Sequence, residues 1–109
     1  MDNVRSASRS VNISDEVLRQ VAARAALDVE GVVRLSGDRT LRDLRGNSVV
    51  IRNLGGAISV GVRVIVATGS RAVPVAKQVQ QAVKQGIQDM TGVTAVHVNV
   101  EISGMGEED

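Results

Sequence analysis

The sequence contains no cysteine, tryptophan, tyrosine or phenylalanine, and only one histidine among its 109 residues. Without cysteine there can be no disulfide, thiolate metal site or thiol chemistry, which is consistent with a reducing cytoplasm. Without aromatic rings, base-stacking platforms, sugar platforms and choline-type cages lose their usual building blocks, and the core must be built from Val, Ile, Leu, Ala and Met. A single histidine leaves no second imidazole for a catalytic base or a multi-histidine metal site.

The chain also lacks an excess of one charge and a long apolar run. Its 13 basic and 12 acidic residues give a net charge of +1, too small by itself to indicate a polyanionic partner. The start, MDNVRSASRS, has no apolar signal-peptide core, and no run approaches the roughly 20 apolar residues that span a bilayer. We therefore expect neither secretion by that route nor membrane insertion.

The length fits one domain. Residues 1–10 are rich in Ser and Arg, and residues 104–109 read GMGEED. Both ends are typical of flexible tails. The sequence therefore predicts a single folded domain over residues 11–103.

The first half of this domain predicts a short extended segment, a helix and a β-hairpin. After residues 11–13, Ser14 is placed to cap a helix over residues 15–29. Its apolar stripe is Val17, Leu18, Val21, Ala25 and Val29. Residues 34–45 are polar and predict an irregular connection, which is followed by strands at 49–51 and 57–67 around Gly55-Gly56.

The second half predicts a long helix and a final strand. Pro74 suits the first turn of a helix that continues to Thr91-Gly92. Gly86 within it indicates close approach to the sheet, since a mid-helix glycine costs about 1 kcal/mol relative to alanine. The buried positions predicted for this helix are Val75, Ala76, Val79, Ala82, Val83, Ile87 and Met90.

Strict alternation marks the last strand. Val96, Val98, Val100 and Ile102 alternate with outward-facing polar residues. Because one helix and short loops connect it to the preceding strand, the two strands should be parallel. The fold class predicted is α/β (α+β): a two-layer sandwich of order β-α-β-β-α-β, with a mixed four-stranded sheet and two helices on one face. The strand order stays open, a ferredoxin-like order being one possibility.

Three stretches resemble the alkaline shock protein family of envelope stress response proteins. Residues 13–37, ISDEVLRQVAARAALDVEGVVRLSG, are similar to the family's extended start, helix and E-G-V turn. Residues 73–93, VPVAKQVQQAVKQGIQDMTGV, resemble its proline-led helix ending in M-T-G, and residues 95–105, AVHVNVEISGM, its final strand. Two departures are a shorter connection between Gly37 and Ser48 and a hairpin without the acidic residues and Tyr often found there.

The resemblance implies a bacterial cytoplasmic protein without catalytic residues or a cofactor. Family members are often peripheral to the membrane through a separate membrane-anchored partner. Some branches are linked to the regulation of lipid synthesis.

The residues themselves offer one candidate surface and one loop. His97, Asn99 and Glu101 share the outward face of the last strand, and Arg63 could lie nearby on the parallel strand. Such a set could be a site, but ordinary cross-strand charge pairing explains it as well. Arg39 and Arg42 belong to an Arg-rich connection that could meet an anionic partner, although Asp38 and Asp43 interrupt it.

These observations predict no catalytic, cofactor-binding or metal-ligating residue. The function predicted is a non-enzymatic interaction or scaffold protein in cell-envelope homeostasis, which contacts a protein partner through the polar sheet face or an exposed edge and could self-associate. The alternative is a nucleic-acid-binding or regulatory module that uses Arg39 and Arg42. An enzyme or small-ligand role centred on His97 is the third class.

Overall fold

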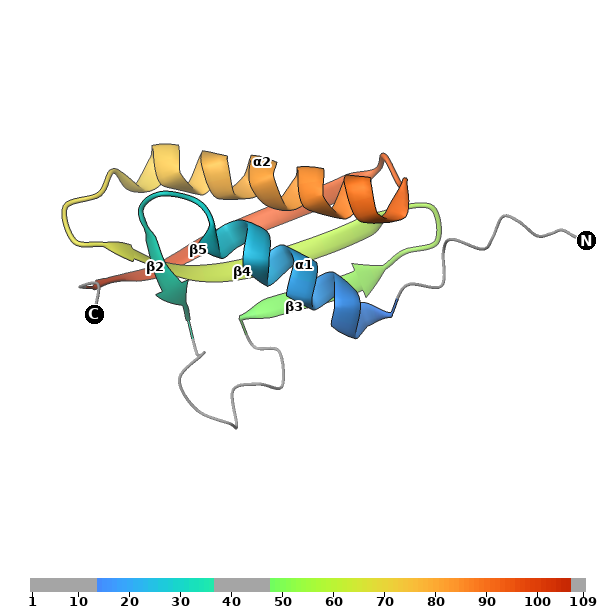
Figure 1. Cartoon of the computed structure of the whole chain (residues 1–109), viewed down its shortest axis with the longest axis horizontal. Helices are drawn as coiled ribbons and strands as arrows, with labels where there is room; N and C mark the ends of the chain where they lie inside the picture. Colours follow the sequence, from blue (N-terminus) through green and yellow to red (C-terminus); the bar gives the residue numbers. More distant parts are fainter. Residues whose placement is uncertain (1–13, 37–47, 107–109) are drawn as a thin grey trace, which may run out of the picture.

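The computed structural model describes residues 14–36 and 48–106, which form a mixed four-stranded sheet with two helices packed on one face (Figure 1). The predicted two-layer α+β sandwich is confirmed. The strand expected at residues 11–13 lies outside the described residues. The elements are α1 Asp15–Leu27, β2 Val32–Leu35, β3 Val49–Asn53, β4 Ile58–Ala67, α2 Ala72–Thr91 and β5 Val96–Gly106.

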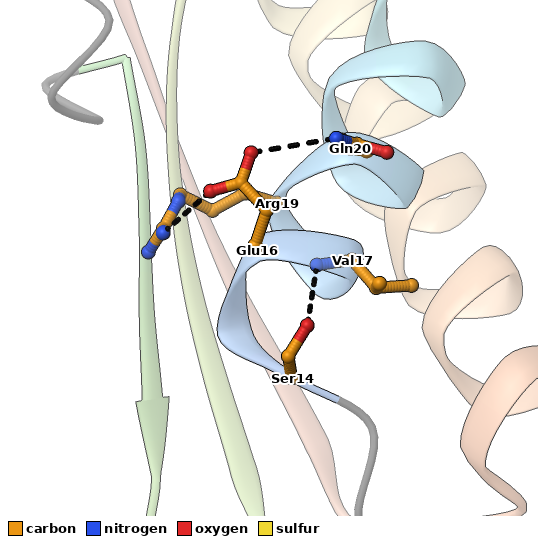
Figure 2. A network of polar contacts seen from close by, with 5 residues as sticks. All are labelled: Ser14, Glu16, Val17, Arg19 and Gln20. Atoms are coloured by element: carbon orange, nitrogen blue, oxygen red, sulfur yellow. Dashed lines mark hydrogen bonds and ion pairs between the residues drawn. The ribbon is translucent and has the colours of Figure 1, made fainter.

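The beginning of α1 is fixed by a side-chain cap. Ser14 Oγ accepts a hydrogen bond from the Val17 N–H at 3.2 Å, which satisfies one of the unpaired donors of the first turn (Figure 2). In the same turn Glu16 pairs with Arg19 at 3.2 Å and accepts a hydrogen bond from Gln20 at 3.4 Å. The predicted cap is confirmed, and α1 ends at Leu27, two residues before the expected end.

The buried face of α1 differs from the predicted stripe. The fully buried residues are Leu18, Ala22 and Ala26, whereas Val17 is 38% exposed. Because α1 contacts the sheet and α2 together, the small alanines allow the backbone to approach the sheet. Val21 and Ala25 are only partly buried and lie toward α2.

Strand β4 is the centre of the sheet. It forms the predicted antiparallel hairpin with β3 and the predicted parallel pair with β5. Its valines at 60, 62, 64 and 66, with Ile58, face the helices and are buried, as their alternation predicts. Strand β5 continues to Gly106, so residues 104–106 belong to the sheet and not to the tail in which we expected them.

Strands β2 and β3 lie end to end along the same side of β4. The Arg63 N–H donates to Ser48 O at 2.8 Å, and Arg63 O accepts from the Ser36 N–H at 2.9 Å. Because both main-chain groups of one strand residue point to the same side, both neighbours share this edge. The prediction of irregular structure from Arg34 was wrong for Arg34 and Leu35, which pair with the end of β4 in β2.

Helix α2 covers the sheet alongside β5 (Figure 1). Val75, Val79, Val83 and Ile87 form its buried stripe, and it ends at Gly92 with φ +75°. Met90 was expected on this stripe but is 45% exposed. Gly86 approaches α1 and not the sheet, because a Cβ built there would lie 3.3 Å from Val21 Cγ1.

Gly31 connects α1 to β2 with φ +102°, a conformation that residues with a side chain rarely adopt. A Cβ at this position would lie 2.9 Å from Val75 Cγ2.

We expect Gly31→Ala to lower the free energy of unfolding by about 1–3 kcal/mol, through backbone strain and this contact. Thermal unfolding measures the loss. Gly56→Ala is the matched control, because no atom lies within 4 Å of its Cβ position; equal melting temperatures for the two variants would contradict the expectation.

Candidate interaction face

The sheet face opposite the helices carries the polar residues predicted from the sequence, and we call it the open face. Arg63 on β4 lies directly across from Glu101 on β5. The Arg63 Nε and Glu101 Oε1 atoms are 3.5 Å apart, with side chains 46% and 64% exposed. An ion pair this exposed contributes little to stability. The role of this ion pair is therefore to present two opposite charges at a fixed position on the open face.

The structure keeps Asn99 near this pair and separates His97 from it. Asn99 lies opposite Gly61, and His97 lies opposite Ser59. His97 is thus four residues from Glu101, roughly 13 Å along a strand. The structure therefore brings Arg63 and Glu101 together but leaves the imidazole outside their reach. Arg39 and Arg42 lie outside the described residues.

A shallow hollow lies beside the ion pair. Its volume is about 240 Å³, and it is lined by Val50, Gly61, Val62, Arg63, Asn99, Val100 and Glu101. Gly61 forms its floor, since a Cβ at that position would meet no atom within 4 Å. Val50, from β3, is 49% exposed at its rim. The open face therefore combines an apolar depression with charged neighbours.

Two further arginines lie on the open face. Arg52 of β3 is opposite Ser59, and Arg34 of β2 is opposite Ile65. The Arg34 guanidinium extends across the sheet until its nitrogens lie 3.5 Å from the Cβ position of Gly106. Together with Arg63 these arginines outnumber Glu101, so the described part of the face carries an excess of positive charge.

Sequence reasoning named Arg34 in the Arg-rich connection but missed its place in the sheet, and it missed Arg52 and the hollow. Arg34 was assigned to an irregular connection, so its place in the sheet could not be inferred. The available signal was Gly61, a glycine on the outward-facing side of a strand otherwise rich in valine, since such a glycine often marks an open spot on a sheet.

The polar groups of this face are suited to recognition. Among residues 14–36 and 48–106, no group of three or more His, Cys, Asp or Glu is placed to hold a metal ion. The groups that do converge are guanidinium, carboxylate, amide and an exposed valine. Such a set can bind a partner by charge and shape complementarity.

Comparison with known proteins places this arrangement in context. A family model for the alkaline shock protein 23 family, of cell envelope-related function, matches residues 3–106. Two relatives from Bacillus subtilis (strain 168) are the uncharacterized proteins YloU and YqhY. The chain is 30% identical to YloU over 104 residues, covering 87% of each protein. It is 27% identical to YqhY over 112 residues, covering 96% of this chain and 83% of YqhY.

Solved structures of MamM CTD variants share the fold. A copper form of one variant superposes with a TM-score of 0.54 at 16% identity, covering 84% of this chain and 98% of that one. A nickel form of another gives a TM-score of 0.53 at 17% identity, covering 82% and 96%. Identities this low establish a common architecture alone.

In the part of the chain that the structure describes, neither helix is long and apolar enough to cross a membrane.

Proposed function

Because this chain belongs to the alkaline shock protein 23 family, which has a cell envelope-related function, we propose that it is a non-enzymatic interaction module that binds a protein partner on its open face. The hollow beside the Arg63–Glu101 pair carries the proposal. A partner can seat one apolar side chain over Gly61 while its charged groups meet the arginines around it.

The charges of the open face indicate the chemistry of this partner. Arg34, Arg52 and Arg63 favour carboxylates, because a guanidinium donates hydrogen bonds to them in a fixed planar fork. The partner is accordingly a protein segment that presents an aliphatic side chain flanked by Asp or Glu. A membrane-anchored partner of this kind would hold the chain at the cytoplasmic surface of the membrane.

Filling the hollow tests the proposal directly. Gly61→Leu places a side chain in the depression, and we expect recovery of the partner from membrane and soluble fractions to fall at least tenfold. Arg63→Glu should have a similar effect through charge, because it faces the partner's carboxylates with a carboxylate. Affinity capture with quantitative mass spectrometry measures both losses.

Controls separate binding from folding. Gly61→Leu should leave the melting temperature within a few degrees of the native value, since the Cβ position is open. Lys77→Glu, on the exposed face of α2, should keep full partner recovery although it reverses a charge as Arg63→Glu does. Partner recovery that is equal for the native chain and Gly61→Leu would refute the open face as the docking site.

A further inference from the structure

One long edge of the sheet has main-chain groups that face outward. Strand β5 bonds to β4 along one side, where Ala95 O accepts from the Ile58 N–H at 2.9 Å. From Ala95 to Ile102, odd-numbered residues of β5 thus point their N–H and C=O groups at β4, and even-numbered residues point theirs outward. Beyond the register shift the pattern reverses, since Gly106 O accepts from the Thr68 N–H at 3.0 Å. Val98 O confirms the pattern, because it accepts a hydrogen bond from the Gln80 side chain at 2.8 Å. No other strand among the described residues pairs with this outer side.

The straight part of this edge is nearly symmetric in sequence. It runs from Val96 to Ile102, where the register with β4 shifts before Gly104. Asn99 is its midpoint. An antiparallel neighbour can pair only where outward-facing residues meet outward-facing residues, so even positions must face even positions. Centring a second β5 on Asn99 fulfils this condition from Val96 to Ile102, although the Val96 N–H already donates to Thr94 O at 3.0 Å.

The same register matches polar and apolar contacts. It sets His97 opposite Glu101 of the second copy, and Glu101 opposite that copy's His97. On the helix side Val100 faces Val98 of the second copy, and Ile102 faces Val96. Val100 and Ile102 are the incompletely buried members of this set, so a second strand would cover them.

Neighbouring registers fit less well. Centring on Val98 puts Glu101 opposite Ala95, and centring on Val100 puts it opposite Asn99. Neither register gives Glu101 a basic neighbour on the second copy. A centre on Glu101 itself would set two carboxylates face to face, which is destabilising.

The edge is accessible to a second strand. A hollow of about 390 Å³ runs beside it, lined by Gln80, Gln81, Lys84, Val96, His97, Val98 and Asn99. The Gln80 contact uses one lone pair of Val98 O, and a carbonyl oxygen can accept two hydrogen bonds. We propose that two copies of this chain join through antiparallel β5 strands across a two-fold axis at Asn99, which makes one continuous sheet.

Charge reversal tests the register. His97→Glu sets two carboxylates against two others across the axis, and we expect the dimer dissociation constant to rise about tenfold or more. Glu101→Lys also weakens its own homodimer, because it removes the carboxylate that faces each imidazole. When the two variants are mixed, the introduced carboxylate of one faces the introduced ammonium of the other, and the remaining native His97 faces the remaining native Glu101. The heterodimer should therefore form more tightly than either homodimer. Sedimentation velocity of full-length chains, one fluorescently labelled, measures all three constants.

A main-chain variant tests the strand pairing itself. The Val100 N–H faces outward, so Val100→Pro removes a donor to the second copy without removing one to β4. We expect at least a tenfold weaker dimer with a cooperative unfolding transition retained. Arg52→Glu, a charge reversal on β3 away from this edge, should leave the dimer unchanged.

Several outcomes would overturn the proposal. A native chain that remains monomeric at millimolar concentration would do so, as would a dimer indifferent to His97→Glu. A heterodimer no tighter than the homodimers would exclude this register, whether or not Val100→Pro folds. Pairing of the edge with a different protein in place of a second copy would also refute it.

Discussion

Replacing Ile87 with alanine should lower the free energy of unfolding by about 2–5 kcal/mol, the usual range for truncating a large buried aliphatic side chain. Ile87 is 0% exposed and is among the largest fully buried side chains of the described residues. Domains of this size are stable by only about 5–15 kcal/mol, so the change removes a large share. No aromatic side chain can fill the cavity that the substitution leaves, because the sequence contains none.

Urea denaturation followed by circular dichroism measures this loss. Met90→Ala is the matched control, since it shortens an exposed side chain on the same helix and should change the stability by about 0.5 kcal/mol or less. A similar loss for both variants would mean that the stripe through Ile87 is not the part of α2 that packs on the sheet.

Gly86→Leu should destabilise the fold by about 1–3 kcal/mol or more through overpacking between the two helices. The Cβ position is already 3.3 Å from Val21 Cγ1 and 3.8 Å from Ala25 Cβ, so a longer side chain must push α1 away. Gly86→Ala should be close to neutral. The better helix propensity of alanine, about 1 kcal/mol, offsets the small displacement that its methyl group requires.

A double variant identifies the contact responsible. Val21→Ala removes the methyl groups nearest to Gly86, so combining it with Gly86→Leu should recover part of the lost stability. The coupling appears as non-additive free energies in a double-mutant cycle. Additive effects of the two substitutions would show that the leucine collides with something other than Val21.

The sequence predicted those elements whose patterns are set by local physics. In β4 an apolar residue that becomes buried recurs at every second position. Only an extended strand places such residues on one face. The Ser14 cap and the first-turn Pro74 placed the starts of both helices. The short connections around α2 then required β4 and β5 to be parallel, as observed.

Features that depend on the contacts between elements were missed. Strand β2 has only four residues, one of them charged, and it exists because Gly31 turns the chain back along the end of β4. Gly86 was correctly read as a close approach, but the helical period alone cannot say whether a small residue faces a sheet or another helix. Met90 has the helical spacing of the buried residues, yet its side chain lies outside the core and is exposed.

Only part of the open face could be predicted, for the same reason. That Arg63 and Glu101 share one face of neighbouring strands followed from alternation plus parallel pairing. The positions of Gly61 opposite Asn99 and of Arg34 opposite Ile65 required the register, which the sequence leaves undetermined. Register is fixed by packing across the whole sheet, so a shift of two residues would retain the faces and change every neighbour.

The meeting of β2 and β3 at Arg63 has a practical consequence for labelling this protein in cells. Ser36 and Ser48 both bond to the main chain of that one residue, so the ends of the interval between them are held at neighbouring positions. Lengthening a connection with fixed ends costs little, because the entropy grows only with the logarithm of its length. An epitope inserted between these two serines should therefore change the free energy of unfolding little.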